Sequence, residues 1–344
     1  MALVAAAVLA AGATAAATVA GWQWATADIG TAGRVAFTNR LAVPPLAPSH
    51  VDERGRRVFD LTATAGRHEF TPGRPARTWG LNGPYLGPTL RATRGESVVV
   101  NVHNRLPEAT TLHWHGMHLP ARMDGGPHQP VQPGRTWSPA WRIEQPAATL
   151  WYHPHPHGAT ARHVYRGLAG LFLVDDPAGA PAGVPGRYGV DDIPLVVQDK
   201  RFRDGELDES MPMIPSTGIL GDTISVNGVV APYLEVGAER VRLRLLNASN
   251  ARVYNFGFSD GRAFEQIGTD GGLLPRPYRT TRVQLSPGER AEVVAAFRPA
   301  DRVVLRSFPP DLGANAWDRR FAGGHDVLDI LQIRAAAVLS PSPA

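Results

Sequence analysis

The sequence predicts an all-β protein in which two β-sandwich or barrel domains follow one another. After about residue 43, short runs alternate between apolar and polar residues, which is the period of a strand with one buried face. Turns are frequent, because the chain holds 36 glycines and 31 prolines. No long helical period stands out after the first thirty residues. The 344 residues are enough for two domains with a sizeable core in each.

An internal repeat supports the two-domain prediction. Asn82 begins a passage of Asn-Gly, Pro-Tyr-Leu and an alternating strand that ends at Asn104. A similar passage runs from Asn227 to Asn247, so the two copies are offset by about 145 residues. A steady offset of that length indicates a duplicated domain.

The repeat also places the domain boundaries. We expect a first domain over residues 43–177 and a second over residues 186–336, joined by a Pro/Gly/Ala linker. Residues 337–344 have the composition of a linker and are expected to form a tail. In chain order, the expected strands lie within residues 57–64, 83–104, 193–200, 263–268, 285–294 and 327–334.

Residues 1–30 read as an export signal or an N-terminal membrane anchor. The run from Met1 to Trp22 is rich in Ala, Val and Leu and carries no charge, and the first arginine is Arg34. The basic segment that usually begins an export signal is missing from this stretch. Both interpretations place the rest of the chain outside the cytoplasm, in the periplasm, the cell envelope or the medium. Membrane contact is expected only through this segment, if it stays uncleaved.

Composition excludes several classes of function. There is no cysteine, which excludes disulfides, thiolate zinc sites, cysteine nucleophiles and any blue-copper site within this sequence. The formal charge is +4, and arginines are scattered singly rather than gathered in a stripe. We therefore expect a solvated surface and no nucleic-acid partner.

Two short histidine motifs carry the chemistry of the sequence. His113 and His115 flank a tryptophan, and His153 and His155 flank a proline in a Trp-Tyr-His-Pro-His run. Side chains at i and i+2 leave the same face of a strand, so each pair offers two imidazoles on one side. If the two strands are neighbours, four imidazoles converge, and neutral imidazole binds copper, zinc, iron or nickel well. A single such pair could be a chance occurrence or part of a core, whereas two pairs predict a metal site.

The motifs around these histidines resemble the first domain of multicopper oxidases, of the laccase and bacterial cuprous-oxidase kind. The resemblance rests on residues 111–116, a Met-Asp-Gly-Gly-Pro segment at 123–127, residues 145–158 and residues 167–174. The second repeat is similar to the second cupredoxin domain of that family. The resemblance covers residues 43–334 and implies two tandem cupredoxin-like Greek-key domains.

The resemblance implies a role for each site residue. In that family the first domain supplies four of the eight histidines of a trinuclear copper cluster that reduces dioxygen to water, with electrons from a reducing substrate. By position, His113 corresponds to a ligand of the type 2 copper, and His115, His153 and His155 to ligands of the type 3 pair. Asp124 matches an acidic residue that assists proton delivery to oxygen, although an aspartate before two glycines also suits a turn.

The sequence departs from the family where a third domain would supply the other four histidines and the type 1 copper site. We therefore expect an oxidoreductase of the multicopper oxidase type that is incomplete and inactive as an isolated chain, as a truncated product would be. Its expected partners are dioxygen, an unidentified reducing substrate, and a missing third domain or another copy of the chain. The alternative is a non-catalytic copper-binding or cell-envelope scaffold protein.

Overall fold

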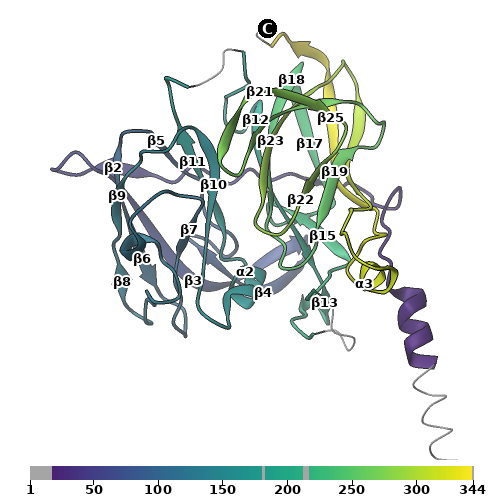
Figure 1. Ribbon diagram of the computed structural model, residues 1–344, viewed down its shortest axis with the longest axis horizontal. Helices are drawn as coiled ribbons and strands as arrows, with labels where there is room; N and C mark the ends of the chain where they lie inside the picture. The colour runs from purple at the N-terminus through teal and green to yellow at the C-terminus, as the bar shows by residue number, and fades with distance from the viewer. Residues whose placement is uncertain (1–17, 180–182, 212–216, 343–344) are drawn as a thin grey trace, which may run out of the picture.

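The computed structural model describes residues 18–179, 183–211 and 217–342. Strands predominate in this part of the chain, and Figure 1 shows them as two β-sandwiches side by side, the first in blue to teal and the second in green to yellow. Helices are short: residues 18–26, η1 (Ala121–Met123), α2 (Thr160–Arg166) and α3 (Ala316–Phe321). The predicted all-β fold with two tandem domains is confirmed.

The first domain consists of two sheets. One has the order β5-β11-β10-β7, and the other has the order β2-β3-β6-β8, with β4 paired to β3 and β9 to β6. The pairs β3 with β6 and β5 with β11 are parallel, so strands distant in the chain lie side by side. The strands are β2 (Ser49–Val51), β3 (Arg57–Thr71), β4 (Arg74–Leu81), β5 (Leu90–Thr93), β6 (Ser97–Asn104), β7 (His113–His115), β8 (Thr136–Trp137), β9 (Ala140–Arg142), β10 (Ala148–His153) and β11 (Gly170–Asp175).

The second domain also has two sheets, ordered β1-β17-β25-β24-β19-β22 and β16-β15-β12-β18-β23-β20-β21. A two-stranded hairpin, β13 with β14, stands apart from them. The strands are β1 (Asn39–Arg40), β12 (Asp192–Lys200), β13 (Phe202–Arg203), β14 (Glu206–Leu207), β15 (Thr223–Val226), β16 (Val229–Val230), β17 (Pro232–Ala238), β18 (Arg240–Asn247), β19 (Tyr254–Phe258), β20 (Phe264–Thr269), β21 (Gly272–Thr280), β22 (Val283–Leu285), β23 (Arg290–Ala296), β24 (Arg302–Phe308) and β25 (Leu328–Ser340).

The asparagines that end the repeated strands make equivalent hydrogen bonds in both domains. Asn104 ends β6, and its Oδ1 accepts from the backbone N–H of Leu106 at 2.9 Å. Asn247 ends β18, and its Oδ1 accepts from the backbone N–H of Ser249 at 3.0 Å. In each case Nδ2 donates to two backbone carbonyls. A buried amide that satisfies three backbone groups explains why the repeat keeps asparagine there.

The asparagines that open the repeat also match. Asn82 has φ +58° and Asn227 has φ +52°, a left-handed conformation that asparagine tolerates better than most residues. Each side chain accepts from a backbone N–H of a preceding strand and donates to a carbonyl two residues earlier in that strand. The internal repeat therefore reflects one turn geometry used twice.

The C-terminal end corrects one expectation. Strand β25 continues to Ser340, so residues 337–340 belong to a strand and not to the linker-like tail expected over residues 337–344. The extension follows from pairing, because β17 runs parallel to β25 up to a register in which Ala238 lies opposite Ser340. Leu339 is buried at 8% exposure, which holds this end of the strand on the second domain.

Only part of the expected export segment can be compared with the structure. Residues 1–17 lie outside the described residues, and residues 18–26 form a short helix. Among the described residues, no helix combines the length and the apolar character needed to cross a bilayer.

Three apolar clusters form the interior. One lies inside each domain, and the third lies between the domains, where Tyr85 and Leu171 of the first meet Val196 and Leu246 of the second. Packing of this kind fixes the two domains against each other. It also brings strands of the second domain close to β10, which ends at His153.

Candidate metal centre

The two histidine motifs lie on neighbouring strands. Strand β7 pairs antiparallel with β10, and His113 stands directly opposite His153. His115 stands opposite Trp151 in the same ladder. His155 follows β10 by two residues, and its backbone N–H donates to Thr111 Oγ1 at 2.6 Å, which ties the motifs together beyond the end of the strand. The structure thus brings all four imidazoles to one edge of the first domain.

Three of the four offer a ready ligand set. One ring nitrogen from each of His113, His115 and His153 lies within 4.8 Å of the other two. The ring centroids of these three are 5.3 to 5.6 Å apart. His155 borders the group, with its centroid 5.4 Å from that of His113 and 6.0 Å from that of His153. Its side chain is the exposed member of the cluster.

Hydrogen bonds fix which nitrogens are free. The Nδ1 of His113 lies 3.1 Å from the backbone oxygen of Asp124, and the Nδ1 of His153 lies 2.8 Å from that of Pro154. Because a carbonyl can only accept, each Nδ1 carries the proton, and each Nε2 has its lone pair available. The Nδ1 of His115 lies 3.1 Å from Nε2 of His153, so without a metal one ring donates to the other. A carbonyl behind a ligand imidazole is a usual means of orienting it toward a metal.

Burial keeps two of these rings neutral. Burial lowers the pKa of His115 to about 4, and the nearby Arg290 and the neighbouring imidazoles add to the effect. Burial also lowers the pKa of His153 well below its ordinary value. A metal binds the deprotonated imidazole, so at neutral pH these ligands need not lose a proton first.

A tryptophan closes the inner side of the cluster. The Trp151 ring stacks on His153 with a centroid distance of 4.0 Å and lies 5.2 Å from His115. Gly288 of the second domain completes this side, because a side chain there would meet His115 at 3.4 Å and Trp151 at 3.6 Å. The cluster is therefore covered on its inner side and open toward the exposed His155.

Asp124 lies beside the cluster. Its Oδ1 is 3.1 Å from Nδ1 of His113, and its side chain is 36% exposed. The turn that follows is tightly packed, because Gly125 has φ +73° and a Cβ there would overlap the carbonyl oxygen of Leu112. Asp124 thus begins a glycine turn, and its carboxylate lies between solvent and a histidine of the cluster, while its role in proton delivery stays a prediction.

The second domain contributes residues that the sequence reasoning missed. Arg290 is buried on β23 and donates from Nε to the carbonyl of Thr149 on β10 at 3.1 Å. Thr149 Oγ1 lies 2.6 Å from Glu292 Oε1 and 2.6 Å from Arg244 Nη1. The available signal was a pair of charged residues, Arg-Ala-Glu, in a run that otherwise reads as a buried strand. These contacts hold β10 four residues before His153.

Other histidines of the first domain lie outside the cluster. His163 is fully buried, with Nε2 2.6 Å from Glu108 Oε1 and Nδ1 3.1 Å from Thr110 Oγ1, so both ring nitrogens are used. His118, His128 and His157 are exposed.

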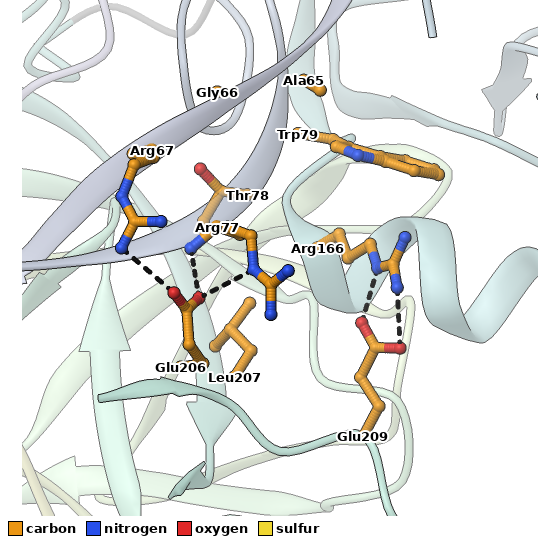
Figure 2. A pocket seen from close by; sticks show the side chains of 10 residues that line it. All are labelled: Ala65, Gly66, Arg67, Arg77, Thr78, Trp79, Arg166, Glu206, Leu207 and Glu209. Carbon is orange, nitrogen blue, oxygen red and sulfur yellow. Dashed lines mark hydrogen bonds and ion pairs between the residues drawn. The ribbon is translucent and has the colours of Figure 1, made fainter. Parts of the chain in front are cut away.

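A separate cavity of about 620 Å³ lies between the domains (Figure 2). Arg67 and Arg77 of the first domain converge on Glu206 of the second, with Arg67 at 3.0 Å. Arg166 pairs with Glu209 through two nitrogens and lies over the Trp79 ring at 4.7 Å. None of the residues that line the cavity is a histidine, and each arginine already faces a carboxylate. The cavity is therefore bounded by ion pairs, two of which link the domains, and it is not part of the metal cluster.

Comparison with known proteins places these observations in a wider context. A family model described as multicopper oxidase matches residues 62–179, which include all four clustered histidines and Asp124. Among curated proteins, the cell division protein FtsP of Xenorhabdus nematophila is 44% identical over 266 residues, which cover 77% of this chain and 55% of that protein. The chain thus spans about half the length of the curated relatives it matches.

Among solved structures, the chain is similar to multicopper oxidases and laccases. The laccase-like multicopper oxidase CueO from Ochrobactrum sp. superimposes with a TM-score of 0.78 at 40% identity, covering 88% of this chain and 67% of that one. A laccase from Pediococcus acidilactici superimposes with a TM-score of 0.77 at 35% identity, covering 87% and 62%.

Proposed function

Since this chain belongs to the multicopper oxidase family, we propose that its four clustered histidines bind copper. His113 takes the place of a type 2 ligand, and His115, His153 and His155 take the places of type 3 ligands. The observation that carries the proposal is the group of three ring nitrogens within 4.8 Å of one another, with two of the rings held from behind by carbonyls. Imidazole donors of this kind suit copper.

The residues around the cluster support the same role. Bound copper in this family supplies one-electron redox chemistry toward dioxygen. The carbonyls of Asp124 and Pro154 hold two imidazoles through Nδ1, which leaves Nε2 of each as the ligand atom, and Trp151 covers one side of the cluster. The Asp124 carboxylate lies between solvent and His113, where it can hold and pass a proton.

As the activity of the whole protein, we propose oxidation of a reducing substrate coupled to reduction of dioxygen to water. A type 1 copper site needs a cysteine sulfur, and this sequence has none. The remaining ligands would come from a further domain or from another copy of the chain. The isolated chain is then expected to bind copper and to show no phenol or cuprous oxidase activity. Export out of the cytoplasm, to the periplasm, envelope or medium, is part of the same proposal.

Copper titration tests the site directly. The purified chain, with Cu(II) added and excess removed, should retain copper and give an electron paramagnetic resonance spectrum with nitrogen couplings from imidazole. His153→Ala should lower copper affinity at least about tenfold, because it removes a ligand that is itself held in place. His157→Ala, an exposed histidine two positions beyond the motif, is the matched control and should bind as the parent chain does. Equal binding by both variants would contradict the proposal.

The alternative function is a non-catalytic scaffold in the cell envelope. It is favoured by one observation, that the curated relatives are named cell division protein FtsP. A scaffold would keep its partner binding in His113→Ala/His153→Ala, whereas an oxidase would lose its activity. Partner binding and oxidase activity are therefore both measured in the native protein and in the His113→Ala/His153→Ala variant. The property that the double substitution removes identifies the function.

A further inference from the structure

We propose that the peptide bond between Ala27 and Asp28 is a processing site, at which an endoprotease that accepts small side chains removes the export segment. Hydrolysis there consumes one water, leaves a carboxylate on Ala27 and frees the amine of Asp28. The proposal does not depend on copper binding, but it rests on the export that belongs to the proposed function. It rests on where the charge-free part of the sequence ends, where the folded domain begins, and how the segment between them is attached.

The sequence changes character at this bond. Residues 1–27 contain no charged side chain, and Asp28 is the first. Ala25 and Ala27 stand at the two positions before the bond where an export protease requires small residues, with Thr26 between them. An uncharged apolar run followed by Ala-x-Ala and then a charged residue is the pattern of a cleaved export signal.

The folded domain begins immediately after the bond. The backbone N–H of Ile29 donates to Asp326 Oδ1 at 2.7 Å, and Ile29 packs against the core of the second domain. Gly30 forms a parallel bridge with Val327, and Thr31 donates from its backbone to the carbonyl of Val327 at 2.9 Å. Removing residues 1–27 leaves all of these contacts in place, whereas a cut a few residues later would break them.

The segment before the bond contacts the second domain at Trp24, through its ring and through its carbonyl, which accepts from Arg320 Nε at 2.9 Å. In Figure 1 the helix of residues 18–26 stands off the second domain beside α3. The Trp24 ring lies 5.1 Å from that of Trp317 and 5.8 Å from that of Phe321, and Arg320 lies 5.4 Å from its centroid. The helix is therefore held by aromatic and cation–π contacts of a ring that stays partly exposed.

The end of this helix can open to fit a protease. Helices shorter than about 12 residues are marginal without tertiary support, and the support here comes through Trp24. Ala25 and Thr26 are exposed at the last turn, where helices fray. An extended segment of this kind can pair with a protease as an added strand.

Asp28 would hold the new terminus on the second domain. Its carboxylate pairs with Arg320, and its other oxygen lies 3.4 Å from Nδ1 of His325. Cleavage after Ala27 therefore leaves the first residue anchored by its side chain, with a free amine at the surface.

The test determines the first residue of the exported protein. The full chain is expressed with its export segment, recovered from outside the cytoplasm, and analysed by N-terminal sequencing and intact mass. We expect the sequence to begin at Asp28. A product that begins elsewhere, or that keeps residues 1–27, would overturn the proposal.

Two variants and one direct reaction sharpen the test. Ala27→Leu places a large side chain next to the bond and should reduce the processed fraction at least about tenfold, since an export protease requires a small residue there; Ala27 is half-buried and belongs to no core cluster. Ala20→Leu is the matched control, because Thr18-Val-Ala20 is the neighbouring small-residue pattern, and it should still yield Asp28. If a chain is not exported, the purified full chain is incubated with a purified signal peptidase. Absence of cleavage between Ala27 and Asp28 in that reaction overturns the proposal as well.

Discussion

The two domains share a fold and a turn chemistry but differ in the polar groups that they bury. Asn104 and Asn247 close equivalent strands with equivalent hydrogen bonds. Next to these shared features, the first domain gathers imidazoles whose ring nitrogens lie close to one another, and the second gathers ion pairs that satisfy one another. Arg244 pairs with Asp192 at 2.6 Å and with Glu292 at 3.3 Å, and all three are buried.

The difference shows how a duplicated domain divides its tasks. Neutral imidazoles with free lone pairs are costly to bury unless a ligand completes them. Paired charges are complete without a ligand, and breaking such a pair is far more costly than leaving it intact. The second domain is therefore built for rigidity, and through Thr149 it transmits that rigidity to the strand that carries His153.

The largest expected effect lies in the second domain. Glu292→Ala leaves Arg244 and Arg242 facing an empty buried space, so the free energy of unfolding should fall by about 3–5 kcal/mol. Urea denaturation measures the change. Glu265→Ala breaks a partly exposed pair with Arg240 and should cost no more than about 1 kcal/mol. Similar losses in the two variants would show that the buried network has no special role.

A second prediction tests the shared part of the comparison. Asn104→Ala and Asn247→Ala each remove three backbone hydrogen bonds from a buried amide, and each should lower the free energy of unfolding by about 2–3 kcal/mol. The two values should agree within about 1 kcal/mol, because the environments match. A large difference in urea denaturation would mean that the repeat is similar in sequence but not in energetics.

The repeat and the histidine motifs were enough to predict the all-β fold, the two domains and the meeting of the imidazoles. The fold and the histidine cluster both depend on local periodicity. Alternation along a strand determines which side chains share a face, and His113 and His153 follow that rule. The separation of Asn82 from Asn227 is close to that of Asn104 from Asn247, and this agreement could be seen directly in the sequence.

The rest depends on contacts between segments distant in the chain. The role of Arg290 follows from its position beside Thr149, 141 residues earlier, which periodicity within β23 does not reveal. The end of β25 at Ser340 follows from its pairing with β17, whereas the Ser-Pro-Ser-Pro composition of the last residues predicted a tail. Proteins place such charged and terminal segments by tertiary pairing, which overrides local composition.

The pH dependence of stability gives a third prediction, at the boundary between the domains. Lys200, the single lysine of the chain, is fully buried, and its Nζ lies 2.6 Å from the carbonyl of Tyr165. Burial lowers its pKa to about 7, against 10.5 in an unfolded chain. Between these values the unfolded state binds more protons, so the free energy of unfolding should rise as pH increases from about 7 to 10.5.

Lys200→Met tests this assignment, because it keeps the length of the side chain and removes the amine. At pH 7 the variant should be more stable by about 1–3 kcal/mol, since the cost of burying the amine exceeds its one hydrogen bond. The advantage should shrink as the pH rises toward 10, because deprotonating the amine on folding costs less as the pH approaches its unfolded pKa of 10.5. Thermal unfolding at both pH values measures it, and a difference that does not change with pH would contradict the assignment.

The smallest expected effect concerns Thr149, which connects the histidine strand of the first domain to the buried ion pairs of the second. Thr149→Val keeps the shape of the side chain and removes the hydroxyl that bonds Glu292 and Arg244, so the free energy of unfolding should fall by about 1–2 kcal/mol. If the second domain orients the histidine strand through this residue, the copper spectrum of the variant should also shift. Thr62→Val changes a half-buried threonine of β3, in the other sheet of the same domain, and should leave the spectrum as it is. A change in stability with an unaltered spectrum would confine the network to holding the domains together, because the imidazoles would then keep their positions without it.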